Sequence, residues 1–227
     1  MADYSILLPG NLAMVQERER FILGLLRKSG WEHLRELRVF EAGCSWEHLR
    51  ELRVFEAGCS SGYNLRQFLQ WGARPEHLAG MDLNPAAVAE HLALSPNIRV
   101  HAGSAEHIPE PDGVFDLSLA FTLFSSVPEE AVSTRIAAEL VRITRPGGLI
   151  VVYDMRRKSR NPGVHPVGKQ DLRRWFPGCK MLSRSITLAP PLARRATAAA
   201  PWLSGPLAAF PPLRSHLITI IRPPATL

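Results

Sequence analysis

From Arg53 to Met155, short apolar runs alternate with segments of helical spacing. The runs VFEAG, LAGMD, IRVHAG, FDLSLAF and LIVVYDM each have the length and composition of a buried strand. Between them, YNLRQFLQWG, NPAAVAEHLAL and a segment marked by Val132, Ile136, Leu140 and Ile143 have the pattern of helices. Strands that alternate with helices predict a doubly wound α/β fold, with a mostly parallel sheet and helices on both faces.

The chain has 227 residues, which fits one domain in three parts. Residues 1–52 form a helical N-terminal extension, and residues 53–155 form the alternating core. Residues 156–227 hold a short helix (DLRRWF), two strands (MLSRSITLA and HLITII) and a segment rich in Pro and Ala between those strands. In the extension, the apolar residues expected on one helix face are Leu12, Val15, Ile22, Leu25 and Leu26.

The phrase WEHLRELRVFEAGCS occupies residues 31–45 and recurs unchanged at residues 46–60. Two such copies are too few for a repeat architecture. The second copy runs directly into a helix-forming segment, and it reaches Gly62 where the first copy reaches Glu47. We therefore expect the second copy to form the first strand and any binding turn. The first copy is expected to be a looped-out extension between the N-terminal helix and the sheet.

The composition is that of an ordinary globular protein, with 46% apolar and 21% charged residues. The first ten residues lack the features of a signal peptide, and no run reaches the ~18 uncharged apolar residues of a membrane span. Three cysteines, two of them duplicates, give no disulfide framework, so a cytoplasmic location is expected. The net charge is +6, and its densest run, MRRKSR, is interpreted as a solvated loop, with contact to an anion as the alternative. No nucleic-acid-binding signature accompanies it.

The loop after the first strand is the first place to look for a ligand, because ligands bind at the carboxyl ends of parallel strands. In the second copy this loop reads EAGCSSG, from Glu56 to Gly62. Its glycines allow the backbone to approach a ligand, and the next helix offers free N–H groups. Asp82 ends the second strand, where an acid commonly bridges the hydroxyls of a ribose. The alternative role for Asp82 is to cap the following helix.

These motifs occur in a fixed order: strand–EAGCSSG–helix, GMDLNP, GSAEHIPEPDGVFDL, and RPGGLIVVYD. Together, from about Arg53 to Asp154, they resemble the class I S-adenosylmethionine-dependent methyltransferases. The resemblance implies a Rossmann-like methyltransferase sheet with an antiparallel C-terminal strand, and S-adenosyl-L-methionine as the cofactor. Residues 53–155 would bind the cofactor, and residues 156–227 would lie on the substrate side. Later motifs, such as FTLFSS and FPGC, resemble a bacterial subgroup of uncertain substrate.

The resemblance also implies roles for individual residues. Glu56 would orient the methionine ammonium, and the turn residues Gly58, Cys59 and Gly62 would pass beside the methionine. Asp82 would hold the ribose, with Leu83 packed on the adenine.

Two positions depart from the family pattern. Ser104, followed by Ala105, replaces an aspartate that reaches the adenine amino group, which predicts weaker binding of the cofactor. Ser60 replaces the second glycine of the turn, which requires a negative φ at Ser60.

Methyl transfer depends mainly on aligning the acceptor with the sulfonium methyl group. Phe121 and Thr122 follow the fourth strand and should line that site. A hydroxyl acceptor would gain from a general base, for which Asp154, His165 and His107 are candidates. For Asp154 the alternative is turn capping, and for each histidine it is a surface or packing role. The motif used to methylate adenine or amide nitrogens is missing, because FTLF stands in its place.

The expected function is methylation of a small-molecule or glycan-type acceptor at a hydroxyl. No CxxC, HExxH or Asp/His cluster indicates a metal. A nicotinamide-dependent oxidoreductase is disfavoured, because GCSSG lacks the middle glycine of G-x-G-x-x-G and no Tyr-x-x-x-Lys pair occurs. A non-catalytic methyltransferase-like binding protein remains an alternative, because of Ser104 and the duplication.

Overall fold

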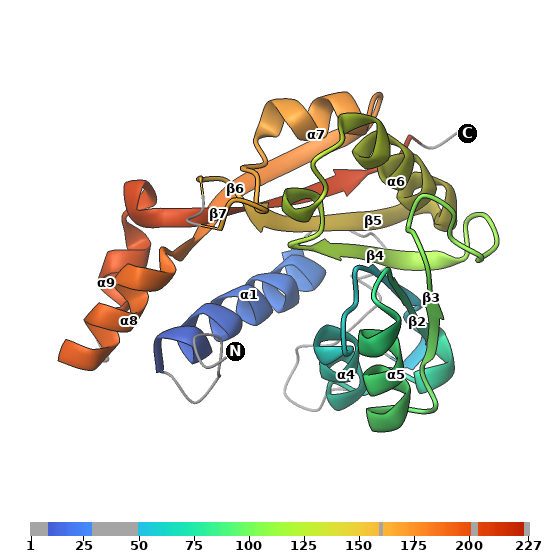
Figure 1. The fold of residues 1–227 in the computed structure, drawn as a ribbon, viewed down its shortest axis with the longest axis horizontal. Helices are drawn as coiled ribbons and strands as arrows, with labels where there is room; N and C mark the ends of the chain where they lie inside the picture. Colours follow the sequence, from blue (N-terminus) through green and yellow to red (C-terminus); the bar gives the residue numbers. More distant parts are fainter. Residues whose placement is uncertain (1–8, 29–49, 159–160, 201–203, 225–227) are drawn as a thin grey trace.

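The computed structural model describes residues 9–28, 50–158, 161–200 and 204–224, which form one seven-stranded sheet covered by helices (Figure 1). The strand order is β3-β2-β1-β4-β5-β7-β6. Strands β1 to β5 pair in parallel, and β7 is antiparallel to both β5 and β6, which confirms the predicted fold. The strands are β1 (Val54–Ala57), β2 (Leu78–Asp82), β3 (Arg99–Ala102), β4 (Phe115–Phe121), β5 (Thr144–Met155), β6 (Lys180–Leu188) and β7 (Arg214–Arg222).

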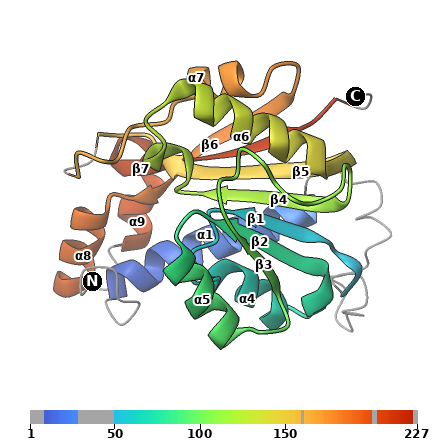
Figure 2. The ribbon, with the colours of Figure 1, turned by 45° about the vertical axis from the view of Figure 1, so that its right-hand side comes forward.

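Helices cover both faces of the sheet (Figures 1 and 2). One face carries α1 (Pro9–Lys28), α4 (Tyr63–Gln70) and α5 (Pro85–Leu94), and the other carries α6 (Glu130–Ile143) and α7 (Lys169–Trp175). Helices α8 (Pro190–Ala199) and α9 (Ser204–Ala209) lie beside α1 at the β6 end of the sheet. The 3-10 turns are η2 (Pro75–His77), η3 (Phe124–Ser126) and η5 (Pro211–Leu213). Each face has its own buried apolar cluster.

Helix α1 confirms the helix predicted near the N-terminus, but its buried face differs from the predicted one. Ile22 is buried as expected, whereas Leu12 is 41% exposed. Two polar residues, Asn11 and Arg18, share the inward face with Ile22 at helical spacing; Asn11 is buried. The spacing of apolar residues alone therefore did not predict which face of α1 is buried. The side chains of residues 25 and 26 lie outside the described part of the structure.

Local signals in the sequence set the helix ends. Asn84 caps α5, because its side-chain Oδ1 accepts a hydrogen bond from the Ala86 N–H at 3.0 Å, and Pro85 fills the first turn. Gly72 closes α4 with a φ of 102°. Asn-Pro before a helix and glycine after one are both typical of helix ends.

The RPGG segment, residues 145–148, has the composition of a turn but is part of a strand. It lies within β5, whose pairing with β4 shifts between Phe115 and Leu117. Thr144 faces Phe115 and Leu149 faces Leu117, so four residues of β5 bulge opposite one residue of β4. Gly147 has a φ of 79°, which lets the strand turn through the bulge and continue.

Of the duplicated phrase, the end of the second copy forms β1 and the turn that follows it, as predicted. The first copy, residues 31–45, lies outside the described residues, so the prediction that it is looped out remains a prediction. The division into residues 1–52, 53–155 and 156–227 is likewise a prediction.

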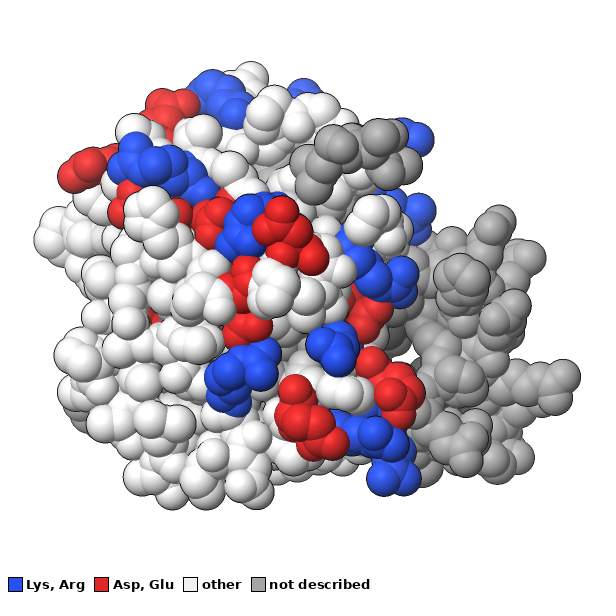
Figure 3. Space-filling model, turned by 90° about the vertical axis from the view of Figure 1, so that its right-hand side faces the viewer, with Lys and Arg blue, Asp and Glu red and all other residues white. Residues whose placement is uncertain are grey.

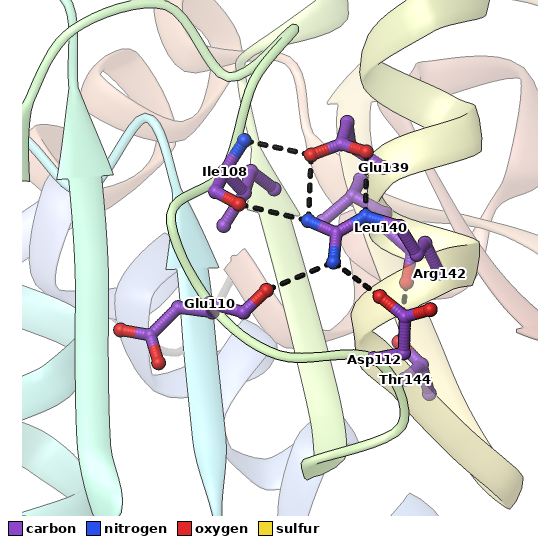
Figure 4. A network of polar contacts seen from close by, with 7 residues as sticks. All are labelled: Ile108, Glu110, Asp112, Glu139, Leu140, Arg142 and Thr144. Carbon is purple, nitrogen blue, oxygen red and sulfur yellow. Dashed lines mark hydrogen bonds and ion pairs between the residues drawn. The ribbon is translucent and has the colours of Figure 1, made fainter.

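The loop between β3 and β4 is fixed to α6 by one arginine (Figure 4). The guanidinium of Arg142 donates to Asp112 at 2.6 Å, to Glu139 at 2.7 Å, and to the carbonyls of Ile108 and Glu110 at 2.8 Å. The Glu139 carboxylate also accepts from the Ile108 N–H at 2.7 Å. This network holds the loop that begins with Ser104 in place at the edge of the sheet.

Candidate functional site

The turn after β1 is tied to the end of β2 by its backbone. The N–H groups of Gly58 and Cys59 both donate to the Met81 carbonyl, at 2.8 and 3.0 Å. The Ser60 N–H donates to Asp82 Oδ2 at 2.8 Å. Two strand ends and the turn therefore form one unit. Burial raises the pKa of the Cys59 thiol, so this side chain stays neutral and packs in the core.

The prediction that Ser60 has a negative φ is wrong. Ser60 has a φ of 48°, between Gly58 at 72° and Gly62 at 81°. A left-handed serine costs about 1–2 kcal/mol, and here the bond from its N–H to the Asp82 carboxylate offsets that cost. The turn keeps the glycine-type backbone although one of its glycines is missing.

A glycine is needed at position 62 for packing as well as for the backbone conformation. A Cβ atom at Gly62 would lie 2.1 Å from Nδ1 of His91, on α5. His91 is buried and neither of its ring nitrogens has a hydrogen-bond partner within the described residues. Burial and the nearby Arg66 lower the pKa of His91, so the ring is neutral at physiological pH. Gly62 thus allows α4 and α5 to meet directly beneath the turn.

Glu56 lies at the centre of the site, fully buried on β1. Its Oε1 accepts a hydrogen bond from Asn64 Nδ2 at 2.5 Å, and Asn64 Oδ1 accepts one from Arg18 Nη2 at 2.7 Å. Its other oxygen, Oε2, is buried without a partner within the described residues. Burial raises the pKa of Glu56 to about 8, with Asn64 and then Arg18 opposing that shift.

The relay from Arg18 to Glu56 was not predicted. Asn64 follows the turn and Arg18 comes from α1, and nothing in the sequence links residues 46 positions apart. The arginine fixes the orientation of the Asn64 amide, so that its NH₂ group points to Glu56. Glu56 therefore presents a single free carboxylate oxygen, which is the arrangement that a primary ammonium group needs.

At the end of β2, both oxygens of Asp82 accept backbone hydrogen bonds. Oδ2 accepts from Ser60 and Oδ1 from the Asn84 N–H at 2.9 Å. Asn84, and not Asp82, caps α5, so the alternative role for Asp82 is excluded. A carboxylate has about four lone-pair positions, which leaves acceptor capacity for a diol. The neighbouring Leu83 is 75% exposed, so an apolar surface stands open beside this carboxylate.

Ser104 lies at the next strand end and already has a partner. Its hydroxyl donates to Glu106 Oε1 at 3.0 Å, and its Oγ accepts from the Glu106 N–H at 3.3 Å. Hydrogen bonds from Arg135 and from Ser104 lower the pKa of Glu106, so that carboxylate is charged. Ala105, beside Ser104, is buried in the core.

An aromatic group lies where β4 and β5 end, on the α1 face of the sheet. Phe121 and Tyr153 meet edge to face at 6.0 Å, and His216 stacks on Tyr153 at 4.7 Å. The Arg18 guanidinium lies 5.2 Å from the Phe121 centroid and 5.7 Å from the Tyr153 centroid. Burial, with Arg18 second, lowers the pKa of His216 to about 4, so its ring is neutral. Arg18, Tyr153 and His216 were missed by the sequence analysis, whereas Phe121 was predicted.

The two candidate bases lie around η3. Asp154 is buried, and its oxygens accept from the backbone N–H groups of Ser125 at 3.1 Å and Met155 at 2.9 Å. Burial raises the pKa of Asp154 to about 6. His165 is exposed, and its backbone N–H donates to the Ser125 carbonyl at 2.8 Å. Both residues therefore hold the same turn. His107, the third candidate, is exposed on the β3–β4 loop, away from η3.

Comparison with known proteins fits this geometry. Residues 55–152 match the family model described as "Methyltransferase domain". The fold agrees with a crystal structure of an S-adenosylmethionine-dependent methyltransferase from Methanosarcina mazei, with a TM-score of 0.57 and 13% identity, covering 78% of this chain and 96% of that one. Residues 55–152 therefore resemble a methyltransferase domain in sequence, and the sheet has the fold of the S-adenosylmethionine-dependent methyltransferases.

Curated relatives of this methyltransferase domain are longer than the match. An S-adenosylmethionine-dependent methyltransferase of Mycolicibacterium smegmatis is 28% identical over 175 residues, which cover 72% of this chain and 59% of that protein. The 2-methyl-6-phytyl-1,4-hydroquinone methyltransferase of Synechocystis is 28% identical over 107 residues, 44% of this chain and 33% of that protein. The chain thus spans about three fifths of the first relative and a third of the second.

S-adenosyl-L-methionine is the cofactor of this class, and the residues present fit it. The free Oε2 of Glu56 suits the methionine ammonium, Asp82 has acceptor capacity for the ribose, and Leu83 is open for the adenine. Among the residues that the structure describes, no group of three His, Cys, Asp or Glu side chains could hold a metal ion. No helix in those ranges has the length and hydropathy to cross a membrane.

Proposed function

We propose that this chain transfers the methyl group of S-adenosyl-L-methionine to a hydroxyl of a small-molecule or glycan-type acceptor. The observation that carries the proposal is Oε2 of Glu56, a buried carboxylate oxygen at the carboxyl end of β1 that has no hydrogen-bond partner among the residues the structure describes. A buried acceptor without a partner is costly, and an ammonium group would satisfy it. The glycine turn beside it leaves room for the methionine end of the cofactor.

In this proposal, each residue of the cofactor site has a specific role. Glu56 would pair with the ammonium, Asp82 would accept from the ribose hydroxyls, and Leu83 would cover the adenine. Gly58, Cys59 and Gly62 shape the turn around the methionine. Ser104 would accept from the adenine amino group through a lone pair of Oγ, without the charge of an aspartate. Ala105 anchors that loop in the core.

When bound, the cofactor supplies an electrophilic methyl group on a sulfonium sulfur. The acceptor would enter beside the contacting rings of Phe121 and Tyr153, which exclude water. Its oxygen must release a proton, and His165, exposed near η3, is the candidate base. Asp154 is closed in by two backbone N–H groups, so we assign it the positioning of η3 and of the His165 segment.

An Asp154→Asn variant separates these two roles once an acceptor gives turnover. If Asp154 positions the turn, kcat falls with little change in the pH–rate profile, whereas loss of the base in His165→Asn removes most of the turnover. If Asp154 is itself the base, the rising limb of the profile near pH 6 disappears in Asp154→Asn instead. Methyl transfer is followed with methyl-labelled cofactor against hydroxylated lipids and sugars.

The described residues on the face drawn in Figure 3 give no reason to prefer nucleic acid as the acceptor. On the face drawn in Figure 3, basic and acidic side chains are interspersed. Several arginines are paired with carboxylates, including Arg135 with Glu106 and Arg174 with Glu130. Such pairing lowers the positive potential that draws proteins to phosphate backbones. The relatives support a small molecule, since that of Synechocystis is named for a hydroquinone. A cytoplasmic location stays a prediction.

One observation favours a second candidate, a non-catalytic binding protein. The Arg18 guanidinium lies over Phe121 and Tyr153, where the acceptor would have to enter. Calorimetric titration of S-adenosylhomocysteine into the purified chain, with NAD as the parallel control, tests both candidates. We expect micromolar binding of the first and none of the second. A folded chain that binds neither would overturn the proposal and favour the non-catalytic candidate.

A further inference from the structure

A cavity of about 810 Å³ lies on the α1 face of the sheet, outside the cofactor site. It lies among α1, β6, α8, α9 and the end of β7, and its size is that of a site for a small organic molecule, roughly 300–1,000 Å³. Most of its wall is apolar, with Met14 and Phe21 from α1, Ile186 and Leu188 from β6, and Ile220 from β7.

The space is created by small residues on the surrounding helices. Ala13 and Gly24 of α1, Ala193 of α8, and Ala208 and Ala209 at the end of α9 line it. A Cβ at Gly24 would meet no atom within 4 Å, so the helix could carry a larger residue there without a clash. Glycine is also among the weakest helix formers, so its presence in α1 leaves the cavity open at a cost in helix stability.

One arginine fixes the wall formed by α9. The guanidinium of Arg214, on β7, donates to the carbonyls of Ala208 at 2.7 Å, Ser185 at 2.9 Å and Ala209 at 3.2 Å. These bonds join the end of α9 to β6 across the cavity. The cavity is therefore a built feature of the fold.

The cavity adjoins the aromatic group of the transfer site. Ile186 and Ile220 belong to the same buried cluster as Phe121 and Tyr153. Between Ile186 and Leu188, Thr187 has a φ of 66°, and its hydroxyl lies 3.0 Å from the Tyr153 hydroxyl. On α1, Glu17 lines the cavity and the next residue, Arg18, lies against Phe121 and Tyr153.

We propose that this cavity binds a hydrocarbon chain of the methyl acceptor, so that the substrate is an amphiphile whose polar end reaches Tyr153. This rests on the proposed function. An apolar wall gains nothing from a sugar, whereas each buried methylene of a chain contributes to binding. Arg20 and Arg184 are exposed and line the cavity, which opens it to solvent for entry of the chain.

The test uses the full chain and a fluorescent probe, 11-(dansylamino)undecanoic acid, displaced by 1-hexanol, 1-octanol or 1-decanol. We expect each added methylene to strengthen displacement by about fourfold. Gly24→Phe should weaken binding of the probe at least tenfold, because the ring fills the cavity. Ala13→Leu is the second filling variant, in case Gly24→Phe does not fold. Leu12→Phe is the control, since it places the same phenyl ring on α1 at an exposed residue that does not line the cavity.

Titration of S-adenosylhomocysteine into each variant separates this inference from the proposed function. The inference is supported if both filling variants lose the probe while Leu12→Phe keeps it and all bind S-adenosylhomocysteine alike. It is overturned if the filling variants bind the probe as the parent does, or if chain length has no effect. If the parent binds the probe but not S-adenosylhomocysteine, the proposed function fails and the acceptor assignment fails with it.

Discussion

The two ends of the sheet are built in different ways. At the β1–β2 end, the site depends on backbone geometry: a turn with three residues at positive φ, bound to the Met81 carbonyl and the Asp82 carboxylate. At the β6–β7 end, the cavity depends on side-chain size, with alanines and one glycine on the helices facing isoleucines and leucines on the strands.

This difference explains which end can be read from the sequence. Backbone geometry needs particular residues at fixed spacing, so glycines and strand-end acids leave a motif. A cavity needs only small residues on elements that happen to meet, and many sequences satisfy that. Helix α1 joins the two ends, because Arg18 faces Asn64 while Met14, Glu17 and Phe21 face the cavity.

The largest expected effect is at Gly62. In Gly62→Ala the new Cβ would meet Nδ1 of His91 at 2.1 Å, at a φ of 81°. We expect destabilisation by at least about 2 kcal/mol and loss of S-adenosylhomocysteine binding. Thermal unfolding measures the destabilisation, and calorimetric titration measures the loss of S-adenosylhomocysteine binding.

The control for Gly62→Ala comes from the other end of the sheet. Gly178→Ala shares the positive φ, at 75°, but its Cβ would meet no atom within 4 Å. Gly178→Ala should therefore lose only the stability that a non-glycine residue loses at a positive φ, which is less than the loss in Gly62→Ala. Adding His91→Ala should recover part of the stability of Gly62→Ala. Equal losses in Gly62→Ala and Gly178→Ala would show that the contact with His91 has no special weight.

Cofactor affinity at the β1–β2 end should depend on pH. Burial raises the pKa of Glu56 to about 8, and the ammonium pairs with the ionised form. Affinity for S-adenosylhomocysteine should therefore fall by about tenfold for each pH unit below 8, until other groups titrate. Titrations at pH 6, 7 and 8 measure this slope, and Glu56→Gln should flatten it. A parent chain with constant affinity over that range would contradict the role of Glu56.

The same ionisation affects stability with the opposite sign. The pKa of Glu56 is higher in the folded chain than its ordinary value of 4.5, so its contribution to stability is full below pH 4.5 and is lost as the pH rises through 8. At pH 9 without cofactor, Glu56→Gln should raise Tm by at least about 2–4 °C, the shift for 1 kcal/mol in a chain of this size. A lower Tm for Glu56→Gln at pH 9 would mean that the charged carboxylate is well solvated or paired.

The smallest effect concerns the helix that joins the two ends. Arg18→Lys keeps the charge but loses the planar fork that holds Asn64, so affinity for S-adenosylhomocysteine should fall about three- to tenfold. Arg20→Lys, on the exposed side of α1, is the matched control and should leave it unchanged. If both variants behave alike, the relay through Asn64 does not order Glu56.

The mostly parallel sheet with its alternating helices, the turn after β1, the start of α5 at Asn84 and the position of Asp82 could all be predicted from the sequence. Each rests on local rules: apolar runs, glycine at positive φ, and Asn-Pro at a helix start. The φ of Ser60 was predicted wrongly, because the Asp82 carboxylate that supports it is distant in the sequence. The same holds for RPGG, which looks like a turn until Thr144 pairs with Phe115.

Arg18 shows why the rest of the site was beyond prediction. On its own it is one of several arginines in an exposed-looking helix. Its contacts with Asn64, Phe121 and Tyr153 exist only because α1 packs across the ends of β4 and β5. Leu12 and Ile22 illustrate the same limit, since apolar spacing gave both residues the same face and packing buried only one.

The duplicated phrase supplies the most direct test of the central claim, that Glu56 in the second copy binds the cofactor. Glu41 and Glu56 occupy the same place in two identical fifteen-residue phrases, at residues 31–45 and 46–60. Calorimetric titration of S-adenosylhomocysteine compares Glu56→Gln with Glu41→Gln at pH 8. Loss of the charge-assisted bond predicts affinity about 10–100-fold weaker in Glu56→Gln and unchanged in Glu41→Gln. Equal affinities in the two variants, or a loss in Glu41→Gln alone, would contradict the account.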